Sequence, residues 1–351
     1  MLRPAILISA VLLAAAGRLE TAAAQPAPQR GTLRGVVRSS LGDPIPYAVV
    51  ALEPGFPRRF SDDSGSFVFP RIAPRTYHLL ARQVGYKPLD TTVVVLADST
   101  VVVAVALEHL VVELAEIRVT AELSRASRPS RCTEPGPPDP ARTPELAAIF
   151  DQLKQNAERY WMLADSYPVA YTMERRRGSR GYVTSVDTLD LRTDTRWHYA
   201  PGNLISDVAE PHGGKGLQVN LPTLPDFADS VFDRTHCFRL IGLDTLEGNT
   251  YVRIDFRPDE RLIEPDADGS AYLDPSSYLV RGARIRLTHP ERVGLASFTA
   301  QVGYREVAPA IAIVESITAD QSVYQGPRLV QHREEQRLQS VFFLRRLPKR
   351  P

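Results

Sequence analysis

The stretch GDPIPYAVVALE, residues 42–53, joins a tight turn to a β-strand. Gly42 tolerates a positive φ, the Asp43 carboxylate accepts hydrogen bonds from nearby backbone, and Pro44 holds φ near about −65°. The run that follows, residues 45–53, is rich in Val, Leu and Tyr, which favour strands. A short strand that starts directly after such a turn is typical of an all-β domain.

Runs of this kind recur over residues 31–120, and a second turn cluster, DDSG, occupies residues 62–65. Seven short strands with regular turns between them predict a β-sandwich of two sheets. The predicted strands cover residues 31–40, 45–53, 65–70, 76–83, 90–97, 99–108 and 114–122.

Within the same region, a series of motifs resembles the carboxypeptidase regulatory-like domain. In chain order they are GVV at 35–37, GDPIPYAVV at 42–50, DSGSFVF at 63–69, IAP at 72–74, TY at 76–77 and GY at 85–86. The resemblance implies a transthyretin-like sandwich, grouped with carbohydrate-binding-like folds. Its members often precede envelope proteins such as TonB-dependent receptors. It implies no peptidase activity, because this is the accessory module and not the zinc domain. The chain departs from the family at Arg75, where a glycine is usual, which leaves the local turn open.

Residues 1–24 have the pattern of a secretory signal peptide. Arg3 lies in a short basic start, residues 5–16 are apolar, and Ala22-Ala23-Ala24 form the cleavage motif. The apolar run is shorter than the roughly 20 residues that span a bilayer, and no later run is longer, so we expect no transmembrane segment. We expect a protein that is exported to the periplasm or associated with the outer membrane; secretion is the alternative.

The formal net charge of the 351 residues is only +1. A chain with so little net charge has no global attraction for nucleic acid, so we expect no nucleic-acid partner.

Residues 121–142 form a predicted proline-rich linker, because five prolines and no apolar periodicity are incompatible with a packed element. Thr143-Pro144 then begins an amphipathic helix, whose apolar positions recur up to Pro168. Alternating strand patterns follow in a domain that we place at residues 143–347. Its predicted strands cover residues 169–177, 181–192, 237–246, 249–258, 269–274, 278–289, 296–307, 310–320 and 329–343.

This second region resembles an uncharacterised domain that follows regulatory-like domains in some bacterial envelope proteins. The matching motifs are HCF at 236–238, Gly269 before YLD at 272–274, and a strand over residues 279–287. By analogy with lipoprotein carriers, we expect a half-barrel. The predicted fold is therefore mainly β: a seven-stranded sandwich, then an α+β domain with one amphipathic helix on a curved antiparallel sheet.

Only two cysteines are present, Cys132 and Cys237. In an oxidising compartment they have one connectivity, so we predict a disulfide between them. His236 precedes Cys237, but neighbouring side chains on a strand point to opposite faces, which opposes a catalytic dyad. We expect His236 to face the other way, where it can form a hydrogen bond or pair with an acid such as Asp233.

Other patterns for catalysis or metal binding are incomplete. His332 and Glu335 lie three residues apart on a strand and so face opposite sides, and no third zinc ligand follows. Asp266, Asp268 and Asp274 lack the closing glutamate of a calcium loop, and Asp268-Gly269 predicts a hairpin turn. We expect no catalytic residue, no metal and no cofactor.

The best binding candidates are Trp197, His198 and Tyr199, because sugar sites use such flat faces together with a few polar groups. We therefore predict a non-catalytic envelope protein that binds or scaffolds a glycan, a lipid or a protein partner, in association with a TonB-dependent or outer-membrane system. The alternative is a hydrolase whose carboxylates and histidine converge only in three dimensions.

The disulfide prediction can be tested on periplasmic protein. The bridge would close a loop of about 105 residues and stabilise the fold by roughly 4 to 5 kcal/mol in the chain-entropy model. Thiol alkylation without reduction, followed by mass spectrometry, should leave Cys132 and Cys237 unmodified. Two alkylated cysteines would refute the bridge.

Overall fold

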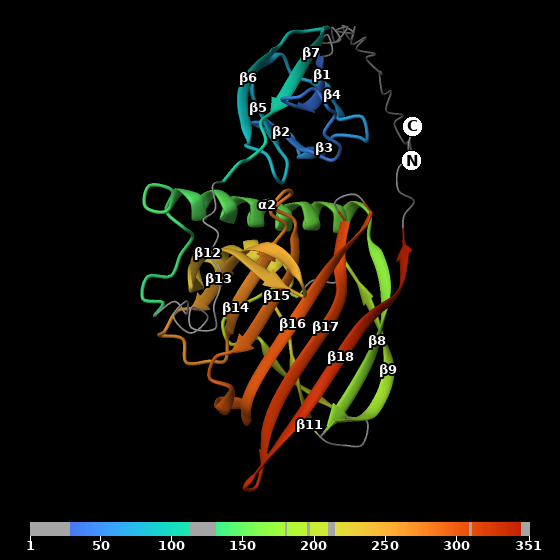
Figure 1. The fold of residues 1–351 in the computed structure, drawn as a ribbon. Coiled ribbons are helices and arrows are strands. Elements are labelled where there is room, and N and C mark those ends of the chain that lie inside the picture. The colour runs from blue at the N-terminus through green and yellow to red at the C-terminus, as the bar shows by residue number, and fades with distance from the viewer. Residues whose placement is uncertain are drawn as a thin grey trace, which may run out of the picture.

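The computed structural model describes residues 29–112, 131–179, 181–194, 197–209, 215–308 and 311–344. Figure 1 shows a small β-sandwich on one side of the long helix α2 (Pro144–Ser166) and a large curved sheet on its other side. Among the described residues, no helix is both long and apolar enough to cross a membrane.

The sandwich has seven strands in two sheets, as predicted. One sheet has the order β4-β1-β7 and the other β3-β2-β5-β6, and only the pairing of β1 with β7 is parallel within them. Strand β3 was not predicted, and the predicted strand at 114–122 lies outside the described residues. The bounds are β1 (Gly31–Ser39), β2 (Val49–Glu53), β3 (Arg59–Phe60), β4 (Ser66–Ile72), β5 (Arg75–Arg82), β6 (Leu89–Val95) and β7 (Thr100–Leu107).

The turn clusters form as their chemistry requires. Gly42 and Gly65 have φ values of 95° and 77°, which favour glycine. The Asp62 carboxylate accepts hydrogen bonds from the backbone N–H groups of Ser64 and Ser66, both at 2.9 Å. Arg75 begins β5, and its side chain donates to the carbonyl oxygen of Pro54 at 2.6 Å. The departure from the family pattern therefore leaves the sandwich intact.

The second domain is built on one antiparallel sheet of nine strands, and its curvature makes a half-barrel, as predicted. Strands β12 to β18 pair in chain order, and β18 then pairs with β8, so the first and last strands of the domain are neighbours. The order along the sheet is β12 (His236–Leu246), β13 (Asn249–Pro258), β14 (Ala267–Leu273), β15 (Val280–Leu287), β16 (Leu295–Ala308), β17 (Ile311–Gln325), β18 (Arg328–Phe343), β8 (Val169–Ser179) and β9 (Tyr182–Arg192).

An insertion between β9 and β12 contributes short elements that the sequence did not predict. They are β10 (Ile205–Ala209), β11 (Lys215–Val219), η1 (Leu224–Ala228) and α3 (Ser230–Thr235), and a further turn, η2 (Pro290–Val293), lies between β15 and β16. Phe227 and Phe232 of this insertion are fully buried against Phe256 of β13, with ring centroids 5.2 and 5.6 Å from it. The insertion therefore covers one face of the sheet.

Helix α2 begins at Pro144, as predicted, and is buried on two sides. Leu146, Ile149, Phe150 and Leu153 enter the core of the second domain. A stripe of polar side chains one turn apart is buried as well: Gln152, Gln155, Asn156 and Arg159. The amphipathic pattern predicted only the apolar contact, because the sandwich that covers part of the polar side is distant in sequence.

The two modules contact each other through that second side of α2. The backbone N–H of Gly85 donates to the Gln152 side chain at 2.7 Å, and Arg58 pairs with Glu158 at 2.9 Å. Val84 of the sandwich is buried in the core of the second domain. The modules are thus packed together.

Cys132 and Cys237 form a disulfide. Cys132 is fully buried, and its carbonyl oxygen accepts from the backbone N–H of Glu260 at 3.0 Å. The described part of the predicted linker, residues 131–142, has no helix or strand. The bridge fixes this segment to the start of β12.

The contact of α2 with the sheet predicts a large loss of stability when a buried side chain of the helix is truncated. Phe150 is buried, and its ring centroid lies 4.5 Å from that of Phe238 on β12. We expect Phe150→Ala to lower the free energy of unfolding by about 3 to 5 kcal/mol. Urea unfolding of the full chain would measure this. Phe342→Ala, at a largely exposed ring, is the control and should change stability by less than about 0.5 kcal/mol.

Candidate functional site

The neighbours His236 and Cys237 do not form a catalytic pair. Cys237 is bonded to Cys132 and has no thiolate. His236 is completely buried, and its ring stacks on that of Phe232 with centroids 3.8 Å apart. Both residues therefore have structural roles.

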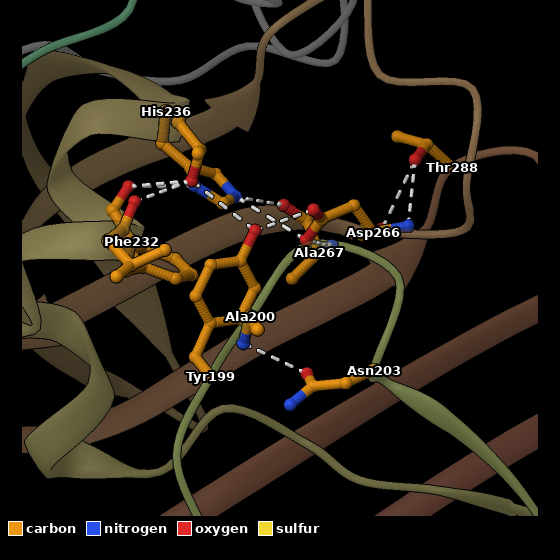
Figure 2. Close-up of polar contacts among 10 residues, drawn as sticks. Tyr199, Ala200, Asn203, Phe232, His236, Asp266, Ala267 and Thr288 are labelled. Carbon is orange, nitrogen blue, oxygen red and sulfur yellow. Dashed lines mark hydrogen bonds and ion pairs between the residues drawn. The ribbon is translucent and has the colours of Figure 1, made fainter.

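Figure 2 shows what holds the imidazole of His236. Its Nδ1 lies 3.0 Å from the carbonyl oxygen of Phe232, and its Nε2 lies 3.0 Å from that of Ala267. Burial lowers the pKa of His236 to about 4, so the ring is neutral at neutral pH. The ring joins α3 to the start of β14.

The acid beside His236 is Asp266 and not Asp233. Nε2 of His236 lies 3.7 Å from Oδ1 of Asp266, whereas Asp233 pairs with Lys154 of α2 at 3.0 Å. The prediction of Asp233 was wrong because residues 230–235 form a helix, which turns its side chain towards α2.

Asp266 is also held by Tyr199, whose hydroxyl donates to Oδ2 at 2.6 Å. Burial raises the pKa of Asp266 to about 6 and raises that of Tyr199. Close by, Asn203 accepts a hydrogen bond from the backbone N–H of Ala200 at 3.0 Å (Figure 2). The cluster anchors the segment around residue 200 to the sheet, and Tyr199, His236 and Asp266 within it are buried.

The predicted binding residues Trp197, His198 and Tyr199 differ in exposure. Tyr199 is buried, with its hydroxyl on Asp266, and Trp197 is half-buried against the core. His198 is exposed and stacks on Trp161 of α2, with ring centroids 5.9 Å apart. The three side chains form no common flat face. Ligand binding by this segment stays a prediction.

The structure brings together a different set of residues in a cleft of about 590 Å³. It lies on the face of the sheet opposite the apolar core, because Arg253, Asp255 and Arg257 of β13 alternate with the buried Val252, Ile254 and Phe256. Five arginines line it with four acids: Arg253, Arg257, Arg284, Arg286 and Arg333, with Glu247, Asp255, Asp268 and Asp320.

Two buried carboxylates organise the base of this cleft. Asp255 accepts from Nε and Nη2 of Arg253 at 2.6 and 3.0 Å, and Ser270 donates to it at 2.6 Å. Asp268 accepts from both Arg257, at 2.9 Å, and Arg286. The carboxylates thus fix the guanidinium groups in position before any ligand arrives.

The wall of the cleft carries an arginine that these acids do not occupy. Arg284 is exposed and donates to the Gln301 side chain at 3.3 Å, and none of the ion pairs among the described residues includes it. Arg286 keeps more than a third of its side chain exposed. Both can therefore donate to a ligand.

The sequence patterns did not indicate this cleft, and we predicted a hairpin turn at Asp268-Gly269, at its base. Asp268 and Gly269 lie inside strand β14 and not in a turn, and a Cβ on Gly269 would lie 2.0 Å from the carbonyl oxygen of Arg284. The glycine permits close packing of β14 on β15. The alternating pattern of Arg253, Asp255 and Arg257 was visible, but not its neighbours across the sheet.

Most of the carboxylates that line the cleft are paired with arginines. Each of Asp255, Asp268 and Asp320 is paired with an arginine. Within the described ranges, no group of three or more His, Cys, Asp or Glu side chains could hold a metal ion.

Comparison with known proteins identifies the first module. The model of the carboxypeptidase regulatory-like domain matches residues 32–108. These residues form a carboxypeptidase regulatory-like domain. No curated protein matches the chain.

Several solved structures are similar to parts of the chain. A LolA superfamily protein from Nitrosomonas europaea is 14% identical over 55% of this chain and 94% of that chain, with a TM-score of 0.27. A putative outer membrane lipoprotein-sorting protein domain from Vibrio parahaemolyticus is 12% identical over 57% and 93%, with a TM-score of 0.32. The match to the minor pilin of Streptococcus agalactiae is 18% identical, covers 26% of this chain and about half (49%) of the pilin chain, and has a TM-score of 0.22.

The buried histidine predicts a pH-dependent effect of its replacement. We expect His236→Gln to lower the free energy of unfolding at pH 7 by about 1 to 3 kcal/mol, because buried hydrogen bonds are lost. The folded pKa of about 4 lies below the unfolded value of about 6.5. The unfolded state therefore binds more protons in this window, and wild-type stability from His236 is lost as pH falls through it.

The difference between the two proteins should therefore shrink by roughly 2 kcal/mol at pH 4.5, as measured by urea unfolding at both pH values. Asp266 titrates in the opposite sense, since its raised pKa of about 6 gives a contribution that is lost as pH rises. Because Asp266 lies 3.7 Å from Nε2 of His236, the same comparison in an Asp266→Asn background separates the two titrations. A difference that does not change with pH would contradict a neutral, buried imidazole.

Proposed function

We propose that this protein is a non-catalytic binding module of the cell envelope, and that the arginine-lined cleft of its second domain binds an acidic glycan. Export rests on the signal-peptide pattern of residues 1–24, which lie outside the described residues. The carboxypeptidase regulatory-like domain at residues 32–108 is consistent with an envelope role.

The observation that carries the proposal is the exposed Arg284 beside the partly exposed Arg286, above the buried acids of the cleft. Guanidinium groups held in advance by carboxylates lose little freedom when a ligand arrives, and they bind carboxylates with two parallel hydrogen bonds. Arg286 is held in this way by Asp268, and Arg257 shares the same carboxylate.

The lining also favours a sugar chain over an acyl chain. Thr299, Gln301 and Thr318 offer hydroxyl and amide groups between the charged residues. A polar lining of this kind gives an acyl chain little apolar surface to contact. Sugar hydroxyls donate and accept hydrogen bonds, so they match neighbouring donors and acceptors.

The pairing of the acids argues for binding rather than hydrolysis. A general base must have a carboxylate oxygen free to take a proton. Both oxygens of Asp255 instead accept hydrogen bonds, from Arg253 and Ser270, and Asp268 is paired with Arg257 and Arg286. These contacts support the binding role over the hydrolase alternative.

Binding of a hexamer of galacturonic acid to the full mature chain tests the proposal. We expect Arg284→Ala to weaken binding about tenfold, because a charge-assisted hydrogen bond is lost. Affinity should also fall as salt is raised. Isothermal titration calorimetry at two salt concentrations would measure both effects.

The matched control is Arg34→Ala, which removes the same charge from an exposed position on strand β1 of the sandwich. It should bind like the wild type. A neutral hexasaccharide of glucose should bind more weakly than the acidic one. Equal affinities of the two variants for the acidic hexamer would rule out the cleft as its site.

A further inference from the structure

A second cavity, of about 290 Å³, lies between the two modules. The sandwich contributes Tyr47, Gln83 and His109 to its wall, and the second domain contributes Arg159, Ser277 and Glu306. Its volume is at the lower end of the range for small-molecule sites, about 300 to 1,000 Å³. A monosaccharide or an amino acid is the size of ligand that fits.

The unusual group in this cavity is the guanidinium of Arg159. Arg159 of α2 is only 6% exposed, and its Nε has no hydrogen-bond partner. None of the ion pairs among the described residues includes Arg159. The negative charge of Glu306 nevertheless attracts its guanidinium group and raises its pKa. Burial lowers its pKa to about 10, so it stays cationic at neutral pH. A buried cation with an unpaired donor destabilises the fold unless a ligand or water pairs with it.

Gln83, whose side-chain oxygen has no partner, lines the same cavity from the other module. Oε1 of Gln83 is buried without a hydrogen-bond partner. Nearby hydroxyls are already in use: Tyr47 donates to Asp63 at 2.5 Å, and Ser277 donates to Asp274 at 3.0 Å. The cavity therefore has an unmet cationic donor on α2 and an unmet acceptor on the sandwich.

A small recess beside the cavity accounts for another unpaired group. It has a volume of about 20 Å³ and is lined by Arg159, Tyr304 and Glu306. The hydroxyl of Tyr304 is buried there without a partner. About one water molecule fits such a volume. One water there can pair with only some of the donors of Arg159, and Arg159 also lines the larger cavity.

We propose that the cavity between the modules binds a small monocarboxylate with a hydroxyl or amide N–H beside the carboxylate. The carboxylate accepts from Arg159, and the neighbouring donor binds Oε1 of Gln83. The bound ligand thus contacts both modules at once. This site is separate from the arginine-lined cleft and independent of its ligand.

The charge of the cavity favours a carboxylate over a phosphate. Glu306 lines the same wall as Arg159, so the two charges of the protein nearly balance. A single negative charge can bind beside Glu306, whereas a phosphate dianion is repelled more strongly. Arg159 has an unpaired donor and Gln83 an unpaired acceptor. A ligand that pairs with both must therefore carry an acceptor and a donor.

Titration of the full chain with N-acetylalanine tests the proposal, because this probe has a carboxylate next to an amide N–H. We expect a saturable heat of binding in calorimetry and a rise in melting temperature as the ligand occupies the folded state. N-acetylalanine amide, which lacks the carboxylate, and inorganic phosphate are the comparison probes.

Arg159→Met should weaken binding of N-acetylalanine at least tenfold, and Gln83→Leu should weaken it about threefold to tenfold. Arg284→Ala, in the other cleft, should bind N-acetylalanine like the wild type. This variant separates the two proposals, because we expect it to bind only the acidic hexasaccharide more weakly. Gln83→Leu lies in the sandwich and keeps the test valid if Arg159→Met does not fold.

Three results would overturn the proposal. They are the absence of saturable binding of N-acetylalanine to the wild type, equal binding by the amide or by phosphate, and unchanged affinity in both Arg159→Met and Gln83→Leu.

Discussion

The whole structure depends on the burial of helix α2 from two directions. Leu146, Ile149, Phe150 and Leu153 fill the core of the half-barrel, and Gln152 on another side of the helix accepts from the sandwich backbone. The apolar contact supplies the free energy, since burying one large side chain is worth about 1.5 to 3 kcal/mol. The polar contacts set the position of the sandwich. The helix thereby positions the cavity between the modules.

Buried polar groups differ in whether they have hydrogen-bond partners within the protein. His236, Tyr199 and Asp266 satisfy one another and the nearby carbonyl groups, so their cluster is structural. The acids of the cleft are likewise paired, and they hold arginines whose outer faces stay open. Arg159 and Gln83 keep unpaired atoms in a cavity. We therefore interpret the first group as structural and propose binding roles for the other two.

Most of the secondary structure could be predicted from local sequence patterns, whereas the arginine-lined cleft and the cavity between the modules could not. The turn at residues 62–65, the start of α2 at Pro144 and the nine strands of the sheet were predictable, because turn chemistry and apolar periodicity act within a few residues. The insertion with α3 was missed, since its six residues are too few to show a helical period. Asp268-Gly269 was misassigned because glycine marks close strand packing as well as turns.

By itself the sequence determined where most strands lie along the chain, the resemblance to the regulatory-like domain through its motifs, and the pairing of two cysteines that had no other partner. Each depends on residues that are neighbours in the chain or on a count of residue types. The tertiary structure decided which face of the sheet carries the arginines and which polar side of α2 is covered. Those outcomes depend on packing between segments far apart in sequence, such as Gly85 against Gln152 and Arg257 against Arg286 through Asp268. Strand alternation places side chains on one face or the other, and only the fold determines which face meets solvent.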